Sequence, residues 1–176
     1  MMMSSTDQKF MMMAGMGGMA EVEMGRLALQ KSSNDGVKQY AQKMIDDHTM
    51  AGDELKQLAS MKGVTLPMQA DTKQMAMMAK MEKLSGMDFD KMYIKEAGVK
   101  AHQDMEKLFM KESMSGKDMD AKAWAAKTLG RPSSERTKWL RQSRKAQSEI
   151  FCLACLANNV VSDQINKQGS LLEESI

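Results

Sequence analysis

The sequence predicts an all-α protein built as an up-down four-helix bundle. Three observations predict this fold class. The chain is rich in Ala, Met, Leu, Lys, Glu and Gln, which are good helix formers. Aromatic residues make up only 5% of the chain, and only two prolines interrupt it. No run of alternating β-branched residues, as expected for strands, occurs between Met1 and Leu129. With 176 residues, the chain is long enough to bury the core of one domain.

The first two helices are expected in the N-terminal third of the chain. The first should span Ser5 to Lys31, with Ser5 or Thr6 supplying an N-cap oxygen. A cluster of Ser, Asn, Asp and Gly follows it and predicts a turn. Asn34 is the expected cap of the second helix, which should continue to Met61 and stop at Gly63.

The middle of the chain predicts one short and two longer helices. The short helix should cover about 71–84, and it is an addition between the second and third long helices of the bundle. A long helix is then expected from Asp88 to about Met114, and a last helix should begin near Asp118. Because the connections are short, consecutive long helices should be antiparallel neighbours.

The first two helices carry stripes of apolar residues at the spacing of a bundle interface. On the second helix the stripe consists of Val37, Ala41, Met44, His48, Ala51, Leu55 and Leu58. On the first helix it consists of Phe10, Ala14, Gly17, Glu21, Met24 and Ala28. Each stripe therefore contains one ionisable residue near its middle.

These two ionisable residues, Glu21 and His48, should lie at similar heights in the bundle. His102 lies near the midpoint of the long helix that follows Gly86, on roughly the same face as Phe109. Bundles assemble metal sites from such side chains on facing helices. The sequence thus predicts that Glu21, His48 and His102 bind one transition metal ion, zinc or copper. The alternative is a buried polar network, in which each inward histidine is simply hydrogen-bonded.

The sequence argues against di-iron chemistry and against an enzyme in general. In di-iron bundles a Glu precedes each ligand His by three residues, whereas here Ile45 and Val99 occupy those positions. No Ser-His-Asp or Cys-His arrangement can be placed on the helices. We therefore expect no catalytic residues, with a metal-dependent oxidoreductase as the alternative.

The 23 methionines are a second signal of metal chemistry. Thioether ligands suit Cu(I), so a copper-handling protein based on the cluster between Met11 and Met19 is a further alternative. Methionine is also an adaptable core residue, and that interpretation competes with copper binding. Met50 and Met68 fall at positions expected to be exposed, where core packing gives no reason for them.

The net charge of +2 and the hydropathy pattern narrow the range of partners. Balanced charge gives no electrostatic footprint for nucleic acid or for an anionic membrane. No stretch of about 20 apolar residues predicts a transmembrane helix, and no signal peptide is evident. Partner proteins are not predicted, and self-association into a homo-oligomer is compatible with a bundle of this kind.

Two segments resemble a widespread bacterial family of unknown function whose members are often described as putative outer-membrane proteins. One is GGMAEVEMGRLALQKSSNDGVKQYAQKMIDDHTMAGDELKQLASMKGVTLP, and the other is MDFDKMYIKEAGVKAHQDMEKLF, which contains Tyr93 and His102. The resemblance extends over residues 4–129. It implies a ferritin-like fold and a periplasmic or cell-envelope location, and it implies no established enzyme activity.

The resemblance stops after Leu129, where the family has a Leu-Pro motif followed by Arg and His. The commonest codons for Gly130 to Leu140, read from the third base of Gly130, permit Pro, two aliphatic residues, Arg, His and Met-Ala in that order. We therefore expect a frameshift, which removes a histidine that would lie level with the other three ligands. The bundle domain should span 4–150 and a poorly specified tail 151–176, where Cys152 and Cys155 form an isolated CxxC pair.

Overall fold

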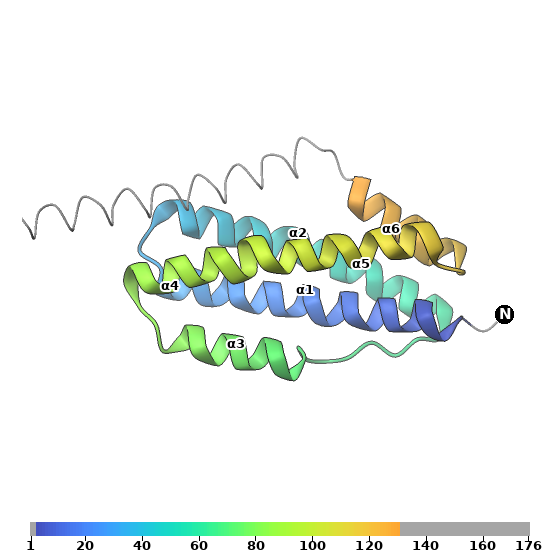
Figure 1. Cartoon of the computed structure of the whole chain (residues 1–176), viewed down its shortest axis with the longest axis horizontal. Coiled ribbons are helices and arrows are strands. Elements are labelled where there is room, and N and C mark those ends of the chain that lie inside the picture. Colours follow the sequence, from blue (N-terminus) through green and yellow to red (C-terminus); the bar gives the residue numbers. More distant parts are fainter. Residues whose placement is uncertain (1–2, 131–176) are drawn as a thin grey trace, which may run out of the picture.

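The computed structural model describes residues 3–130 of the chain, and every regular element in that range is helical (Figure 1). The prediction of an all-α protein is therefore confirmed for these residues. The predictions for 131–150, for the tail at 151–176 and for Cys152 and Cys155 lie outside the described residues.

The two N-terminal helices begin and end close to the predicted positions. Helix α1 spans Ser5–Lys31, but its N-cap is Ser4, whose side chain accepts a backbone N–H of the first turn. Helix α2 spans Asp35–Lys62 and has the predicted cap, Asn34. It ends at Gly63, whose φ of 65° is the left-handed conformation that glycine adopts without strain.

The short helix α3 spans Thr72–Glu82, within the predicted range of about 71–84. Asp71 and Gln74 form a reciprocal capping box, with side-chain to backbone distances of 2.8 and 2.9 Å. Lys31 at the end of α1 donates hydrogen bonds from Nζ to the carbonyl oxygens of Glu82 and Leu84. These bonds fasten the end of α3 to the end of α1.

The long helix predicted at 88–114 is present but is not a regular α-helix. It begins as α4 (Gly86–Tyr93), continues as the π-helix η1 (Ile94–Lys100) and ends as α5 (Ala101–Ser115). A π-helix has i to i+5 hydrogen bonds; it is rare in proteins and is frequently found at functional sites. The last described helix, α6, spans Met119–Gly130 and begins where predicted.

The helices lie mostly side by side along one axis (Figure 1). Helix α1 has its most extensive contacts with α2, its antiparallel neighbour, and the rod formed by α4, η1 and α5 runs along α1. Helix α3 packs outside this group, against α1 and α4. Helix α6 turns back at the far end of the rod and contacts α5 and α2.

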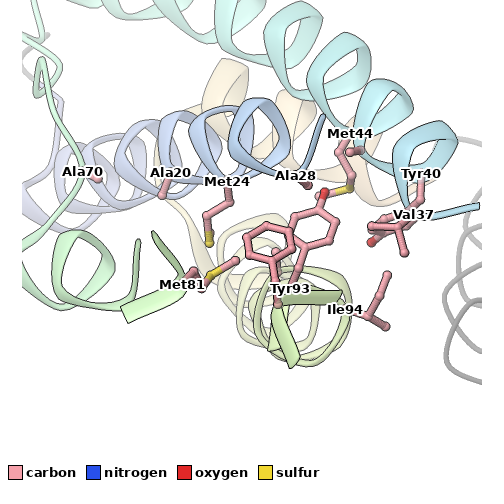
Figure 2. Close-up of a cluster of buried hydrophobic side chains, with 13 residues drawn as sticks. Ala20, Met24, Ala28, Val37, Tyr40, Met44, Ala70, Met81, Tyr93 and Ile94 are labelled. Carbon is pink, nitrogen blue, oxygen red and sulfur yellow. The ribbon is translucent and has the colours of Figure 1, made fainter. Parts of the chain in front are cut away.

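The core consists of two apolar clusters at opposite ends of the helices. The first cluster is built from α1, α2, α3, α4 and η1, and it includes Met24, Tyr40, Met44, Met81, Phe89 and Tyr93 (Figure 2). The second is built from α1, α2, α5 and α6, and it includes Phe10, Met11, Leu55, Leu58, Phe109 and Trp124. The three aromatic rings of the second cluster contact one another, with centroids 5.2 to 5.9 Å apart.

The predicted stripes face this core. All six residues of the α1 stripe are buried, and on α2 only His48 and Ala51 of the stripe are partly exposed. Burial of these side chains, at about 25 cal/mol per Å² of apolar surface, is the main force that holds the helices together. Met50 and Met68 are exposed as predicted, Met68 almost completely at 95%.

Candidate functional site

The three predicted ligands come together between the two apolar clusters. Helix α1 contributes Glu21, α2 contributes His48 and α5 contributes His102. Buried residues of the first cluster lie to one side of these ligands and buried residues of the second cluster to the other, so the three side chains form one polar layer across the core. We call Glu21, His48 and His102 the central site.

The distances within the central site are short. Glu21 Oε2 lies 2.7 Å from His48 Nε2, and Glu21 Oε1 lies 3.6 Å from His102 Nδ1. The imidazole rings are nearly perpendicular, with an interplanar angle of 89° and centroids 5.5 Å apart. One ligand atom from each of the three residues lies within 4.8 Å of the other two. Sequence reasoning therefore identified residues that the fold does bring together.

Backbone carbonyls orient both histidines. His48 Nδ1 lies 3.0 Å from the carbonyl oxygen of Met44, one turn earlier on α2. A carbonyl oxygen only accepts hydrogen bonds, so Nδ1 carries the proton and Nε2 is directed at Glu21. His102 Nδ1 lies 3.1 Å from the carbonyl oxygen of Ala97, five residues earlier. Hydrogen bonds of this kind fix ring orientation in many protein metal sites.

The π-helix η1 positions His102. In a regular α-helix, the side chain of residue 102 would lie over the carbonyl groups three or four residues before it. Here the imidazole of His102 instead contacts the carbonyl oxygen of Ala97, five residues before it, which matches the i to i+5 spacing of the π-helix. The neighbouring carbonyl oxygen of Gly98 accepts a hydrogen bond from the hydroxyl of Tyr40, at 3.4 Å. The π-helix η1 thus contacts both His102 of the central site and Tyr40 of the first apolar cluster.

Burial and mutual attraction set the protonation states of the central site. Burial alone would raise the pKa of Glu21, but attraction to His48 and His102 lowers it below its usual value. Burial opposes the charged form of His48 as well, yet the attraction and hydrogen bond of Glu21 raise its pKa. Burial lowers the pKa of His102, and repulsion from a protonated His48 adds to the effect. These shifts favour the charged forms of Glu21 and His48 and the neutral form of His102.

Two tyrosines lie next to the central site, a placement that no pattern in the sequence predicted. Tyr40 and Tyr93 are both buried (Figure 2), and their rings meet edge to face with centroids 6.1 Å apart. The ring of Phe89 stacks on that of Tyr93. Burial raises the pKa of the Tyr40 hydroxyl, and the negative charges of Tyr93 and Glu21 raise it further. Burial and the negative charge of Glu21 also raise the pKa of the Tyr93 hydroxyl. Both hydroxyls therefore stay protonated.

A second buried polar group, which no pattern in the sequence predicted, lies where α1 begins and α5 ends. Asp7 of α1 is fully buried, and its carboxylate accepts the backbone N–H groups of Lys117, at 3.1 Å, and Asp118, at 2.9 Å. Glu112 of α5 is also buried, beside Asp7. Burial and the repulsion of the charges on Asp7 and Asp118 raise the pKa of Glu112 to about 7. Asp7 therefore fixes the turn between α5 and α6, in addition to its place at the N-terminus of α1.

The methionines divide between core and surface. In the cluster between Met11 and Met19, Met11 is completely buried, whereas Met12 and Met13 are exposed by 40% and 42%. Met61, Met114 and Met119 are more than 70% exposed. Packing therefore accounts for only part of the methionine content.

The chain belongs to a family that is defined by a domain of unknown function, DUF4142, whose match covers residues 1–136. The sequence-based expectation of a family of unknown function is thereby confirmed. No curated protein and no solved structure gives a significant match to the chain. Within residues 3–130, none of the helices has both the length and the apolar character needed to cross a membrane.

Proposed function

We propose that this protein is a non-enzymatic, exported bacterial envelope protein that binds one transition metal ion, zinc or copper, at the central site. The observation that carries the proposal is the convergence of one carboxylate and two imidazoles, from three different helices, within 4.8 Å of one another. The ligands lie between two apolar clusters that hold their helices in place.

The donor set fits a borderline metal ion. Two imidazoles and one carboxylate are the ligands of many zinc sites and also suit copper, and three protein ligands leave a fourth position for another donor. A bound cation would compensate the buried charge of Glu21, which is only 2% exposed. The carbonyl of Met44 leaves His48 Nε2 as the ligand atom, the arrangement expected for a metal-bound imidazole.

Metal and protons compete for this site. His48 must lose its proton to bind a metal ion, and its pKa is raised by Glu21. Metal affinity should therefore fall as the pH drops through the raised pKa of His48. The rival interpretation, a structural polar network, also contains the Glu21–His48 ion pair but predicts no metal affinity.

Equilibrium dialysis followed by chelator competition tests the proposal. The wild type should bind one Zn(II) or copper ion, and each of Glu21→Gln, His48→Gln and His102→Gln should weaken binding by about 10-fold or more. Glu23→Gln is the matched control, because Glu23 is exposed on the same helix as Glu21. If the wild type binds no metal, or if all three variants bind metal as tightly as the wild type, the proposal is refuted. The structural polar network would then be the remaining interpretation of the central site.

The proposal includes the ferritin-like arrangement of a four-helix bundle, which the family resemblance implies. It also includes the periplasmic or envelope location and the absence of catalysis, which follow from the family resemblance and the lack of ExxH pairs on the ligand helices. Export would be tested by fractionating cells that express the complete native gene. Recovery of the protein only with cytoplasmic markers would refute the location.

We also propose that the reading frame changes near Gly130. The family match ends at residue 136, well before Ile176, and the alternative frame permits the Pro, Arg, His and Met-Ala expected there. The restored histidine would lie level with the central site. Resequencing the parent gene across this region tests the proposal, and the present reading frame found intact in the gene and in a close relative would refute it.

A further inference from the structure

We propose that the thioether of Met105 completes the central site as its fourth ligand and makes it selective for Cu(I) over Zn(II). This inference rests on the proposed metal-binding function and deepens it by naming the metal. It depends on where the sulfur atom of Met105 lies.

Met105 faces the same interface as the ligands. It follows His102 by three residues on α5, a spacing that places both side chains on one face of the helix. Its Sδ lies 2.8 Å, and its Cε 2.9 Å, from the point that a Cβ atom would occupy at Gly17 of α1. Gly17 precedes Glu21 by one helical turn, so positions 17 and 21 are neighbours, with Cβ positions about 5–6 Å apart. The sulfur therefore lies between α1 and α5, about one turn from Glu21, within reach of a flexible side chain.

The glycine at position 17 makes this approach possible. A contact of 2.8 Å is too short for a real Cβ, so any other residue at this position would displace the thioether. Gly18 provides the comparison, because a Cβ built there meets no atom within 4 Å. At position 17, the absence of a side chain leaves room for the sulfur of Met105.

Other core methionines near the central site are occupied elsewhere. Met44 and Met24 belong to the first apolar cluster, where Met44 is directed toward Tyr93 and Met24 toward the interior of the cluster (Figure 2). Met105 instead packs at the edge of the second cluster, next to Gly17. A thioether favours Cu(I), whereas zinc sites are built from thiolate, imidazole and carboxylate ligands. Met105 should therefore affect the two metals differently.

The test compares Cu(I) and Zn(II) affinities of the purified full-length protein. Cu(I) affinity is measured by competition with a chromogenic chelator under anaerobic reducing conditions, and Zn(II) affinity by competition with a fluorescent chelator. Met105→Leu, which nearly conserves side-chain volume, should weaken Cu(I) binding by about 10-fold or more and change Zn(II) binding by less than about twofold. Gly17→Ala should act in the same direction, because it displaces the sulfur.

Two matched variants control for folding and for methionine content. Gly18→Ala makes the same substitution one residue away, and Met24→Leu removes a core thioether from α1. Both should leave the Cu(I) affinity unchanged. Melting curves of all four variants show whether each remains folded.

The outcomes separate this inference from the proposed function. If the wild type binds metal but Met105→Leu changes neither affinity, or weakens Cu(I) and Zn(II) binding equally, the role of Met105 is refuted while metal binding stands. If the wild type binds neither ion, the proposed function itself fails. A loss of Cu(I) affinity in Gly18→Ala as large as in Gly17→Ala would also refute the geometric argument.

Discussion

Glu112→Gln should remove a pH dependence from the stability of the protein. Glu112 is only 3% exposed, and it lies beside the fully buried Asp7. Burial and the neighbouring carboxylates raise its pKa from 4.5 to about 7, so the folded protein holds a proton here that the unfolded chain has released. The stabilisation of the folded state by this proton is fully present below the pKa of Glu112 in the unfolded chain. It is lost as the pH rises through the pKa of Glu112 in the folded protein.

The size of the effect follows from the shift. At about 1.4 kcal/mol per pKa unit, the wild type should lose at most about 3 kcal/mol between about pH 4.5 and pH 8. Between pH 5 and pH 8 the loss should be about 2 kcal/mol, because the unfolded chain has already released most of this proton at pH 5. Glutamine imitates the protonated carboxyl and can donate a hydrogen bond to Asp7. The variant should thus match the wild type near pH 5 and exceed its stability by about 2 kcal/mol near pH 8.

Urea unfolding of both proteins at the two pH values measures this difference directly. Glu82→Gln is a suitable control, because Glu82 is an exposed glutamate at the end of α3. It should change stability by about the same small amount at both pH values. A difference between Glu112→Gln and the wild type that does not depend on pH would refute the assignment of the proton to Glu112.

Three further predictions concern packing and caps. Gly25→Ala should lower the free energy of unfolding by about 1–3 kcal/mol in a urea titration, because the new Cβ would lie 2.9 Å from Ile45 Cγ1 and 3.1 Å from a backbone carbonyl of α2. Asp71→Ala should cost about 1 kcal/mol through loss of the capping box, and hydrogen exchange should show the fraying confined to α3. Tyr93→Phe should leave the melting temperature equal or higher, because the buried Tyr93 hydroxyl has no hydrogen-bond partner among the described residues. A melting temperature lowered by several degrees would contradict this.

The sequence predicted the helices and the central site because both depend on local patterns. Turn residues such as Gly63 marked the helix ends, and the apolar stripes of α1 and α2 showed which residues face the core. Glu21 and His48 were recognisable because each interrupts such a stripe. His102 was expected near the same height from its position along its own helix, and the structure places it there.

Other features depend on contacts between distant residues and could not be predicted. The π-helix η1 has no distinct pattern, since its residues would also suit an α-helix, and only the packing of His102 and Tyr40 against its carbonyls reveals its register. Asp7 resembled an ordinary first-turn acid of a helix, but its partners lie more than 100 residues away in the chain. The contact between Gly17 and Met105 likewise joins two separate helices.

The most direct test of metal binding is thermal melting with and without added Zn(II) or copper, for the wild type, His48→Ala and His102→Ala. A ligand present at 100 times its Kd stabilises the folded state by about 2.7 kcal/mol, which should raise the melting temperature of the wild type by roughly 5–10 °C. We expect this rise to disappear in both variants. A wild-type melting temperature unaffected by either metal, or an equal rise in all three proteins, would contradict metal binding at the central site.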